Sequence, residues 1–202
     1  MFDLSFIQLV MRAIGTVVVV TLMGFSVAGF ARLLGDKGTA YDGKLTLNPF
    51  VHVDIFGLFG GTIGRGGWTR PIAIDPAAGR MGRATPVIVA LLTMAAIFLF
   101  GRLVLLALPW VAAYWPVSSA AFVDATIRMT ADIAAWTLAI NIIPIPPLLG
   151  GYLLLSFAPD AHGWLVRRHL YVSIVLAVLV VLAYQSLPAT PFGELARLLG
   201  AR

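Results

Sequence analysis

The sequence contains no cysteine among its 202 residues. It therefore has no disulfide framework, no thiolate metal site and no cysteine nucleophile. Charged residues are also scarce, at 11% of the chain, and the net charge of +5 is too small and too dispersed to indicate nucleic-acid binding. On so apolar a chain, the few basic residues are better explained as orientation signals and contacts with lipid headgroups. No internal repeat is visible, which disfavours a transporter built from repeats.

Hydrophobic residues make up 60% of the chain, and its mean hydropathy is +0.95. Several apolar runs approach the roughly 20 residues that a helix needs to cross a bilayer. These runs predict an all-α polytopic membrane protein in one domain, 1–202, with about four transmembrane helices. The expected spans are 6–34, 85–108, 120–143 and 170–187.

The basic residues are distributed unevenly between the connections. The connection 109–119 carries none, and Arg167 and Arg168 fall on the same side as the loop 37–84 if the first three spans alternate in direction. Because basic residues accumulate in cytoplasmic loops, the loop is expected in the cytoplasm and both termini outside. The interval from 32 to 84 holds seven basic residues: Arg32, Lys37, Lys44, Arg65, Arg70, Arg80 and Arg83.

The segment 141–151, NIIPIPPLLGG, places three prolines within four positions: Pro144, Pro146 and Pro147. Proline removes a backbone donor and clashes with the preceding turn, so a helix cannot continue through this segment. Irregular backbone at membrane depth is tolerated where it is buried in protein or lines a wet cavity. The segment 144–158 is therefore predicted to be broken or re-entrant, and the alternative is a plain loop between two spans.

The loop 37–84 contains a second distinctive stretch, GKLTLNPFVHVDIFG at 43–57. The alternation at its start is typical of a strand, and Asn48-Pro49 is a turn signal. His52 could be a metal ligand, but a hydrogen-bonded structural role near Asp54 is the favoured interpretation. His162 and His169 are too poorly spaced to chelate together and are expected at headgroup level.

Three charged residues recur at a spacing of four within the third predicted span: Asp124, Arg128 and Asp132. This spacing places them on one helical face. Each isolated charge at the centre of a span costs about 2.5–3.5 kcal/mol, so they are expected to pair and to face protein or water. An internal ion-pair ladder is the simpler interpretation. A contact with a membrane partner, or a polar cavity, is the functional one.

Both distinctive segments resemble the site-2 protease family of intramembrane zinc metalloproteases. The family segment Asn-(Leu/Phe)-Leu-Pro-(Ile/Leu)-Pro-Pro-Leu-Asp-Gly-Gly is matched at Asn141, Pro144, Pro146, Pro147, Leu148, Gly150 and Gly151. The family form G-R-L-T-L-N-P-x-x-H-I-D-P-x-G is matched at Gly43, Leu45, Thr46, Leu47, Asn48, Pro49, His52, Asp54 and Gly57. The stretch 67–76 continues the resemblance, which covers residues 20–155. It implies a membrane-associated, β-hairpin-like loop that can pair with an extended substrate.

The resemblance also implies where zinc would be held, and this chain departs from the family there. The third-ligand Asp is Leu149. Counting back from Leu34-Gly35-Asp36, the two histidines and the glutamate of His-Glu-x-x-His fall on Met23, Val27 and Gly24. Zinc hydrolysis needs three protein ligands, an open position for water and a general base. No metal, no cofactor and no catalytic residue are therefore expected.

These observations favour a catalytically inactive, site-2-protease-like protein of the bacterial inner membrane. It would bind or regulate other transmembrane proteins, or serve as an accessory subunit of a membrane complex. One alternative is an active metallopeptidase with a relocated metal site, for which His52, Asp54 and Asp132 are the only nominees. A second is a small transporter or channel that uses the face formed by Asp124, Arg128 and Asp132.

Overall fold

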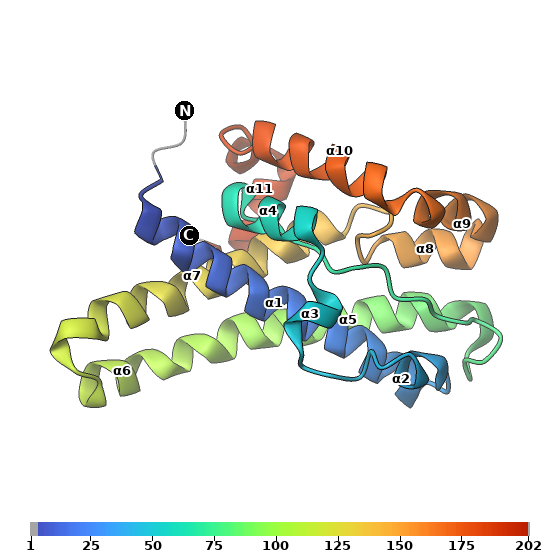
Figure 1. Ribbon diagram of the computed structural model, residues 1–202, viewed down its shortest axis with the longest axis horizontal. Helices are drawn as coiled ribbons and strands as arrows, with labels where there is room; N and C mark the ends of the chain where they lie inside the picture. Colours follow the sequence, from blue (N-terminus) through green and yellow to red (C-terminus); the bar gives the residue numbers. More distant parts are fainter. Residues whose placement is uncertain (1–3, 202) are drawn as a thin grey trace.

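The computed structural model describes residues 4–201, and these residues fold into α-helices and short 3-10 helices without any β-strand (Figure 1). The all-α class predicted from the sequence is confirmed. The elements in chain order are α1 (Phe6–Leu33), α2 (Gly38–Tyr41), α3 (Pro49–His52), α4 (Ile55–Gly64), η1 (Gly82–Ala84), α5 (Thr85–Leu103), η2 (Val104–Ala107), α6 (Leu108–Tyr114), α7 (Val117–Asn141), α8 (Gly151–Phe157), α9 (Pro159–Arg167), α10 (His169–Leu182), η3 (Leu187–Ala189) and α11 (Pro191–Leu199).

Two helices are long and apolar enough to cross a membrane, α1 and the continuous helix Gly82–Tyr114. A third is obtained if α9 and α10, which meet at a bend of 83°, are counted as one span. By itself α10 has 14 residues and is about 21 Å long, short of the roughly 30 Å of a hydrocarbon core. The chain is thus a membrane protein by length and composition, but these criteria do not yield the predicted four spans.

The second span is longer than the predicted 85–108, and part of the expected connection 109–119 is helical. Pro109 does not end the helix because it occupies the first turn of α6, where its missing N–H is not needed. As a result, α6 and the N-terminal half of α7 form a hairpin that extends beyond the other helices, at the left of Figure 1.

The core lies around α1, which packs against α4, α5 and α7. A capping box starts α1: Ser5 Oγ accepts from Gln8 N at 3.3 Å, and Ser5 N donates to Gln8 Oε1 at 2.9 Å. The buried face of α1 runs through the cluster formed with α5, α7, α8 and α10. Its members from α1 are Val19, Met23, Val27 and Ala31.

The loop 37–84 does not form the predicted β-hairpin. Residues 4–201 contain one isolated β-bridge in place of a strand pair, between Val53 and Thr69. Two side chains explain the difference, because each starts a helix where a strand was expected. Asn48 Oδ1 accepts from Phe50 N at 3.1 Å to begin α3, and Asp54 Oδ1 accepts from Phe56 N and Gly57 N of α4 at 2.8 and 2.9 Å.

Helix α4 turns back into the helical bundle and packs against α1 and α10. Glycines allow this close approach: a Cβ at Gly61 would overlap Thr16, and one at Gly64 would overlap Val180. After α4, residues 66–75 return as an extended stretch without helix (Figure 1). Residues 55–75, which enter the helical bundle and then leave it again, are called the re-entrant segment; it is distinct from the proline segment. It carries Arg65 away from the other basic residues of the loop, with which the sequence had grouped it.

The proline segment interrupts the chain at the predicted place. Helix α7 ends at Asn141, residues 142–150 form irregular turns, and α8 begins at Gly151. Helices α8, α9 and α10 then reverse direction in short steps, with α8 packed against α5 and α9. The expected broken segment 144–158 is therefore a turn followed by a helix of seven residues.

Candidate functional site

Asn141 is the centre of the proline segment. Its side chain is fully buried and makes three hydrogen bonds. Nδ2 donates to Gly67 O at 2.9 Å and to Thr137 O at 2.8 Å, while Oδ1 accepts from Leu149 N at 3.0 Å. One amide thus joins α7, the re-entrant segment and the proline segment, and satisfies polar backbone groups that are shielded from water.

The two glycines that close the proline segment are required by close backbone contacts. Gly150 N donates to Asn141 O at 2.7 Å, and a Cβ at position 150 would overlap the carbonyl oxygens of Ile142 and Ile143. A Cβ at Gly151 would lie 2.6 Å from Pro146 N. No L side chain fits at these two positions. Within the segment, Pro146 and Pro147 are buried and joined by a cis peptide bond, whereas Pro144 is exposed.

The positions at which the sequence resemblance predicts metal ligands lie in one hydrophobic environment. Met23, Val27 and Leu149 are all buried members of the main core cluster. Gly24 faces His52 so closely that a Cβ would overlap the imidazole Nδ1. A valine and a leucine offer no lone pair, and a thioether is only a weak acceptor. The arrangement provides neither a zinc-binding set nor space for a base at position 24.

His52 and Asp54 are both buried, but they have different partners. His52 Nε2 donates to Thr46 O at 2.7 Å. Burial lowers the pKa of His52; the hydrogen bond to Thr46 opposes this shift and the charge of Lys44 adds to it. The carboxylate of Asp54 caps α4 as described above. The neutral imidazole therefore fixes the loop that precedes α3.

Asp132, the third nominee for a relocated metal site, lies near Arg65, with its Oδ2 3.8 Å from Nη1. The three nominees therefore do not converge on one point. More generally, no three histidine or acidic side chains in the described part of the chain are grouped so that they could hold a metal ion.

The predicted internal ladder is replaced by two separate pairs. Asp124 accepts from Arg128 Nε at 2.7 Å and from Nη2 at 3.1 Å, but both side chains are exposed. Asp132 instead forms an ion pair with Arg65 from the re-entrant segment. Arg12 lies nearby and donates to Ile63 O and to Tyr184 Oη. Helical spacing could not reveal these partners, because Arg12 lies in α1, Arg65 follows α4 and Tyr184 follows α10.

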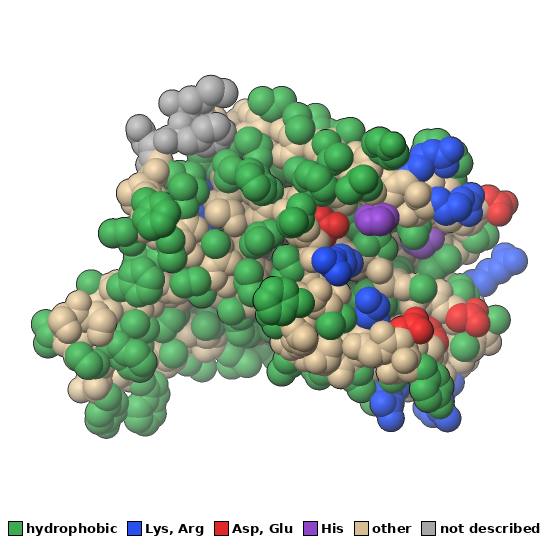
Figure 2. All heavy atoms as spheres, viewed as in Figure 1, with side chains coloured by type: hydrophobic (Ala, Val, Ile, Leu, Met, Phe, Trp, Pro, Cys, Tyr) green, Lys and Arg blue, Asp and Glu red, His purple; other side chains and the backbone are tan. Residues whose placement is uncertain are grey.

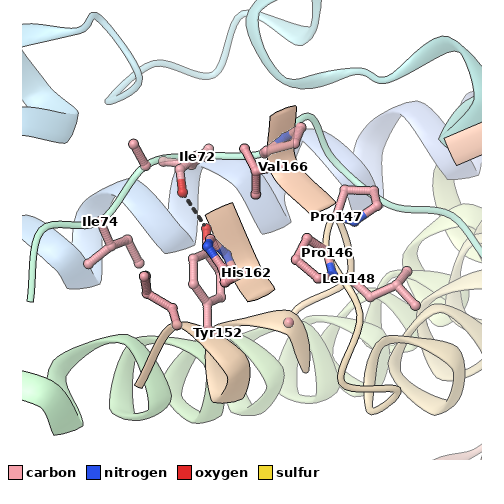
Figure 3. A pocket seen from close by; sticks show the side chains of 12 residues that line it. Ile72, Ile74, Pro146, Pro147, Leu148, Tyr152, His162 and Val166 are labelled. Carbon is pink, nitrogen blue, oxygen red and sulfur yellow. Dashed lines mark hydrogen bonds between the residues drawn. The ribbon is translucent and has the colours of Figure 1, made fainter. Parts of the chain in front are cut away.

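A groove of about 300 Å³ opens beside the proline segment (Figure 3). Its walls are the extended stretch 71–74 on one side and the proline segment on the other, and α8 and α9 contribute Tyr152 and His162. Tyr152 is buried and donates from its hydroxyl to Ile72 O at 2.8 Å. The lining is mainly apolar, as in most ligand sites. Tyr152 was not singled out by the sequence, and His162 lines this groove.

Most backbone groups of the stretch 71–74 have no hydrogen-bond partner among residues 4–201. Ile72 O accepts from Tyr152, and no other backbone N–H or C=O of this stretch forms a hydrogen bond with the residues at 4–201. Ile72 and Ile74 are buried, whereas Ala73 between them is exposed. An extended stretch of this kind can accept a further strand.

Comparison with models of known protein families, with curated proteins and with solved structures found no match to this chain. The site is therefore interpreted from its own geometry. That geometry consists of a buried asparagine centre, an apolar groove and an extended stretch with open backbone groups.

Proposed function

We propose that this chain is a site-2-protease-like membrane protein without peptidase activity, and that it docks segments of other transmembrane proteins. The proposal rests on one observation. Met23, Val27 and Leu149, which stand where the family holds zinc, are buried in a hydrophobic core, while Asn141 still ties together the framework around them.

The chemistry of these positions argues against hydrolysis. Zinc activates water when three protein ligands leave one coordination position open, and a nearby carboxylate then removes the proton. Methionine, valine and leucine do not replace imidazole and carboxylate ligands. A glutamate at position 24 would also displace the His52 ring, which contacts Gly24 directly.

The groove supplies a mode of binding. An unwound, extended segment of a partner can pair with the open backbone groups around Ala73, and one of its apolar side chains can enter the groove between Ile72 and Pro147. This mode supplies affinity through backbone hydrogen bonds and selectivity through one pocket. It suits a regulatory or accessory subunit of a membrane complex.

The proposal includes a topology of four spans. These are α1, the helix 82–114, α7 and the predicted span 170–187, which continues α10 beyond its last residue, with the loop 37–84 in the cytoplasm of a bacterium and the protein in its inner membrane. The distribution of charge supports this orientation. Charged side chains gather at the end formed by α2, 76–84 and α9, at the right of Figure 2, and the opposite end is largely hydrophobic on this face. We call these the basic end and the apolar end.

The absence of catalysis is tested by the zinc content of the purified protein, with an authentic site-2 protease treated identically. We expect no bound zinc in this chain and about one equivalent in the control. Equimolar zinc that disappears in His52→Ala would overturn the proposal and indicate a relocated metal site.

Docking is tested with a photo-crosslinking amino acid placed at Ala73 in native membranes. We expect adducts with discrete membrane proteins at Ala73 and none at Leu182, which is 66% exposed on α10 away from the groove. Equal adducts at both positions would contradict docking at the groove. Ion flux through proteoliposomes that is lost in Asp124→Asn would instead favour the transporter alternative.

A further inference from the structure

A second groove lies between the start of α5 and α8 and has a volume of about 550 Å³. Val87 and Ile88 of α5 form one side, and Leu153 and Phe157 of α8 form the other. Arg83 of η1, whose side chain is exposed, also lines this groove. The groove is separate from the one beside the proline segment, with which it shares no lining residue.

The hydrophobic walls of the second groove are open to the surroundings. Phe157 is 80% exposed and Leu153 is 45% exposed, although both are large apolar side chains. Exposed apolar surface is stable when lipid or a partner covers it. A transmembrane helix with its side chains is about 10–12 Å across and would not fit inside a groove of 550 Å³, which has the size of a small-molecule site. An acyl chain is narrow enough.

The positive charge of Arg83 favours anionic lipids over lipids without net charge. The side chain of Arg83 is exposed, and no carboxylate at positions 4–201 lies within ion-pair distance of it. Arg83 lies at the basic end, where Figure 2 shows charged side chains gathered, so it is placed where a headgroup would sit. Basic pockets between helices at this membrane surface favour anionic headgroups.

We propose that this second groove binds one anionic glycerophospholipid. The acyl chain lies between α5 and α8 against Val87, Leu153 and Phe157, and the phosphate contacts the guanidinium of Arg83. This site is independent of the docking function proposed above, because neither its residues nor its ligand are shared with the first groove.

Native mass spectrometry of the purified full chain, titrated with dioleoylphosphatidylglycerol or dioleoylphosphatidylcholine, tests this proposal. We expect the first phosphatidylglycerol to bind at least about fivefold more tightly than phosphatidylcholine, the contribution of one arginine near a membrane surface. Arg83→Gln should bring that ratio to about one. Arg102→Gln is the matched control, because Arg102 is an exposed arginine further along the helix 82–114 and does not line the second groove.

Filling the groove tests the position of the acyl chain. Val87→Trp should weaken the first binding step of both lipids, whereas Leu99→Trp, at an exposed position of α5 that does not line this groove, should not. The proposal is overturned if Arg83→Gln keeps the preference, if Arg102→Gln removes it equally, or if Val87→Trp binds both lipids as the natural chain does. Arg83→Gln alters only a surface side chain, so the test does not depend on the folding of Val87→Trp.

Discussion

At the residue scale, the contact between Gly24 and His52 determines how the loop 37–84 meets α1. Glycine lowers helix stability by roughly 0.5–1 kcal/mol relative to alanine, so its presence in the middle of α1 has a cost. The imidazole of His52 occupies the space where a Cβ would stand, and its Nε2 fixes Thr46. The cost is therefore offset by close packing of a fully buried histidine.

Replacing Gly24 by alanine is expected to destabilise the protein by about 1–3 kcal/mol, because the added methyl group would force His52 to move. The control is Gly29→Ala on the same helix, where the nearest atom to the new Cβ is Leu45 Cδ1 at 3.7 Å. Gly29→Ala should be neutral or slightly stabilising. Thermal unfolding in detergent compares the two variants, and equal stability would contradict the packing described here.

His52 also makes stability depend on pH. Its pKa is lowered chiefly by burial, so the unfolded chain binds a proton more readily than the folded protein. Stability contributed by the neutral ring is present above the unfolded pKa of about 6.5 and is lost as the pH falls towards the folded value. The fall in unfolding free energy between pH 7 and pH 5 should be smaller in His52→Gln. His169→Gln is the matched control, and an unchanged slope in His52→Gln would refute the assignment.

At the scale of elements, the re-entrant segment is the least expected part of the fold. Its helix α4 has ten residues and ends within the bundle, where its last carbonyl groups need donors. Arg12 of α1 supplies one donor, from Nη1 to Ile63 O at 3.3 Å, and its other nitrogen donates to Tyr184 Oη at 3.0 Å. Arg12 thus holds the end of α4 between α1 and α10.

Arg12→Met is expected to loosen α4 while keeping most of the apolar volume of the side chain. Because the chain has no cysteine, one introduced at Thr62 reports on this opening through its rate of alkylation. We expect that rate to rise about tenfold or more, since each 1.4 kcal/mol lost raises the open population tenfold. Arg102→Met serves as the control, and the same rise in both variants would show that the effect is not local.

At the scale of the whole molecule, the chain has two chemically different ends. The basic end is formed by α2, 76–84 and α9, and the apolar end by the hairpin of α6 and α7 (Figures 1 and 2). A protein that crosses a bilayer with this distribution presents its basic end to the cytoplasm.

Cysteines introduced at the two ends test this arrangement in intact cells. Tyr41 in α2 is 83% exposed and Val117 at the start of α7 is 93% exposed. A membrane-impermeant maleimide should label Val117→Cys in intact cells, and Tyr41→Cys only after the membrane is opened. Labelling of both from outside would reject the proposed orientation, and the cysteine-free parent chain provides the blank.

The helical class, the membrane character and the place where α7 ends were predictable from the residues alone. These follow from composition and from local sterics: apolar runs favour helices in lipid, and Pro144 to Pro147 cannot continue a helix. The sequence did not determine that 43–57 would form short helices, because its alternating residues favour a strand while Asn48 and Asp54 cap helices. The two local patterns predict different structures for this stretch, and the helical one is stabilised by the packing of α4 against α1 and α10.

Contacts between residues that are far apart in the sequence depend on how the helices pack. Asp132 pairs with Arg65, Asn141 joins Gly67 to Leu149, and Tyr152 reaches Ile72 across 80 positions. Helical spacing reports neighbours three or four residues apart, so it placed Asp124 and Arg128 together but carried no information on contacts between α7 and a segment that folds back into the bundle. The grooves depend on such contacts, and for that reason they were visible only once the chain was folded.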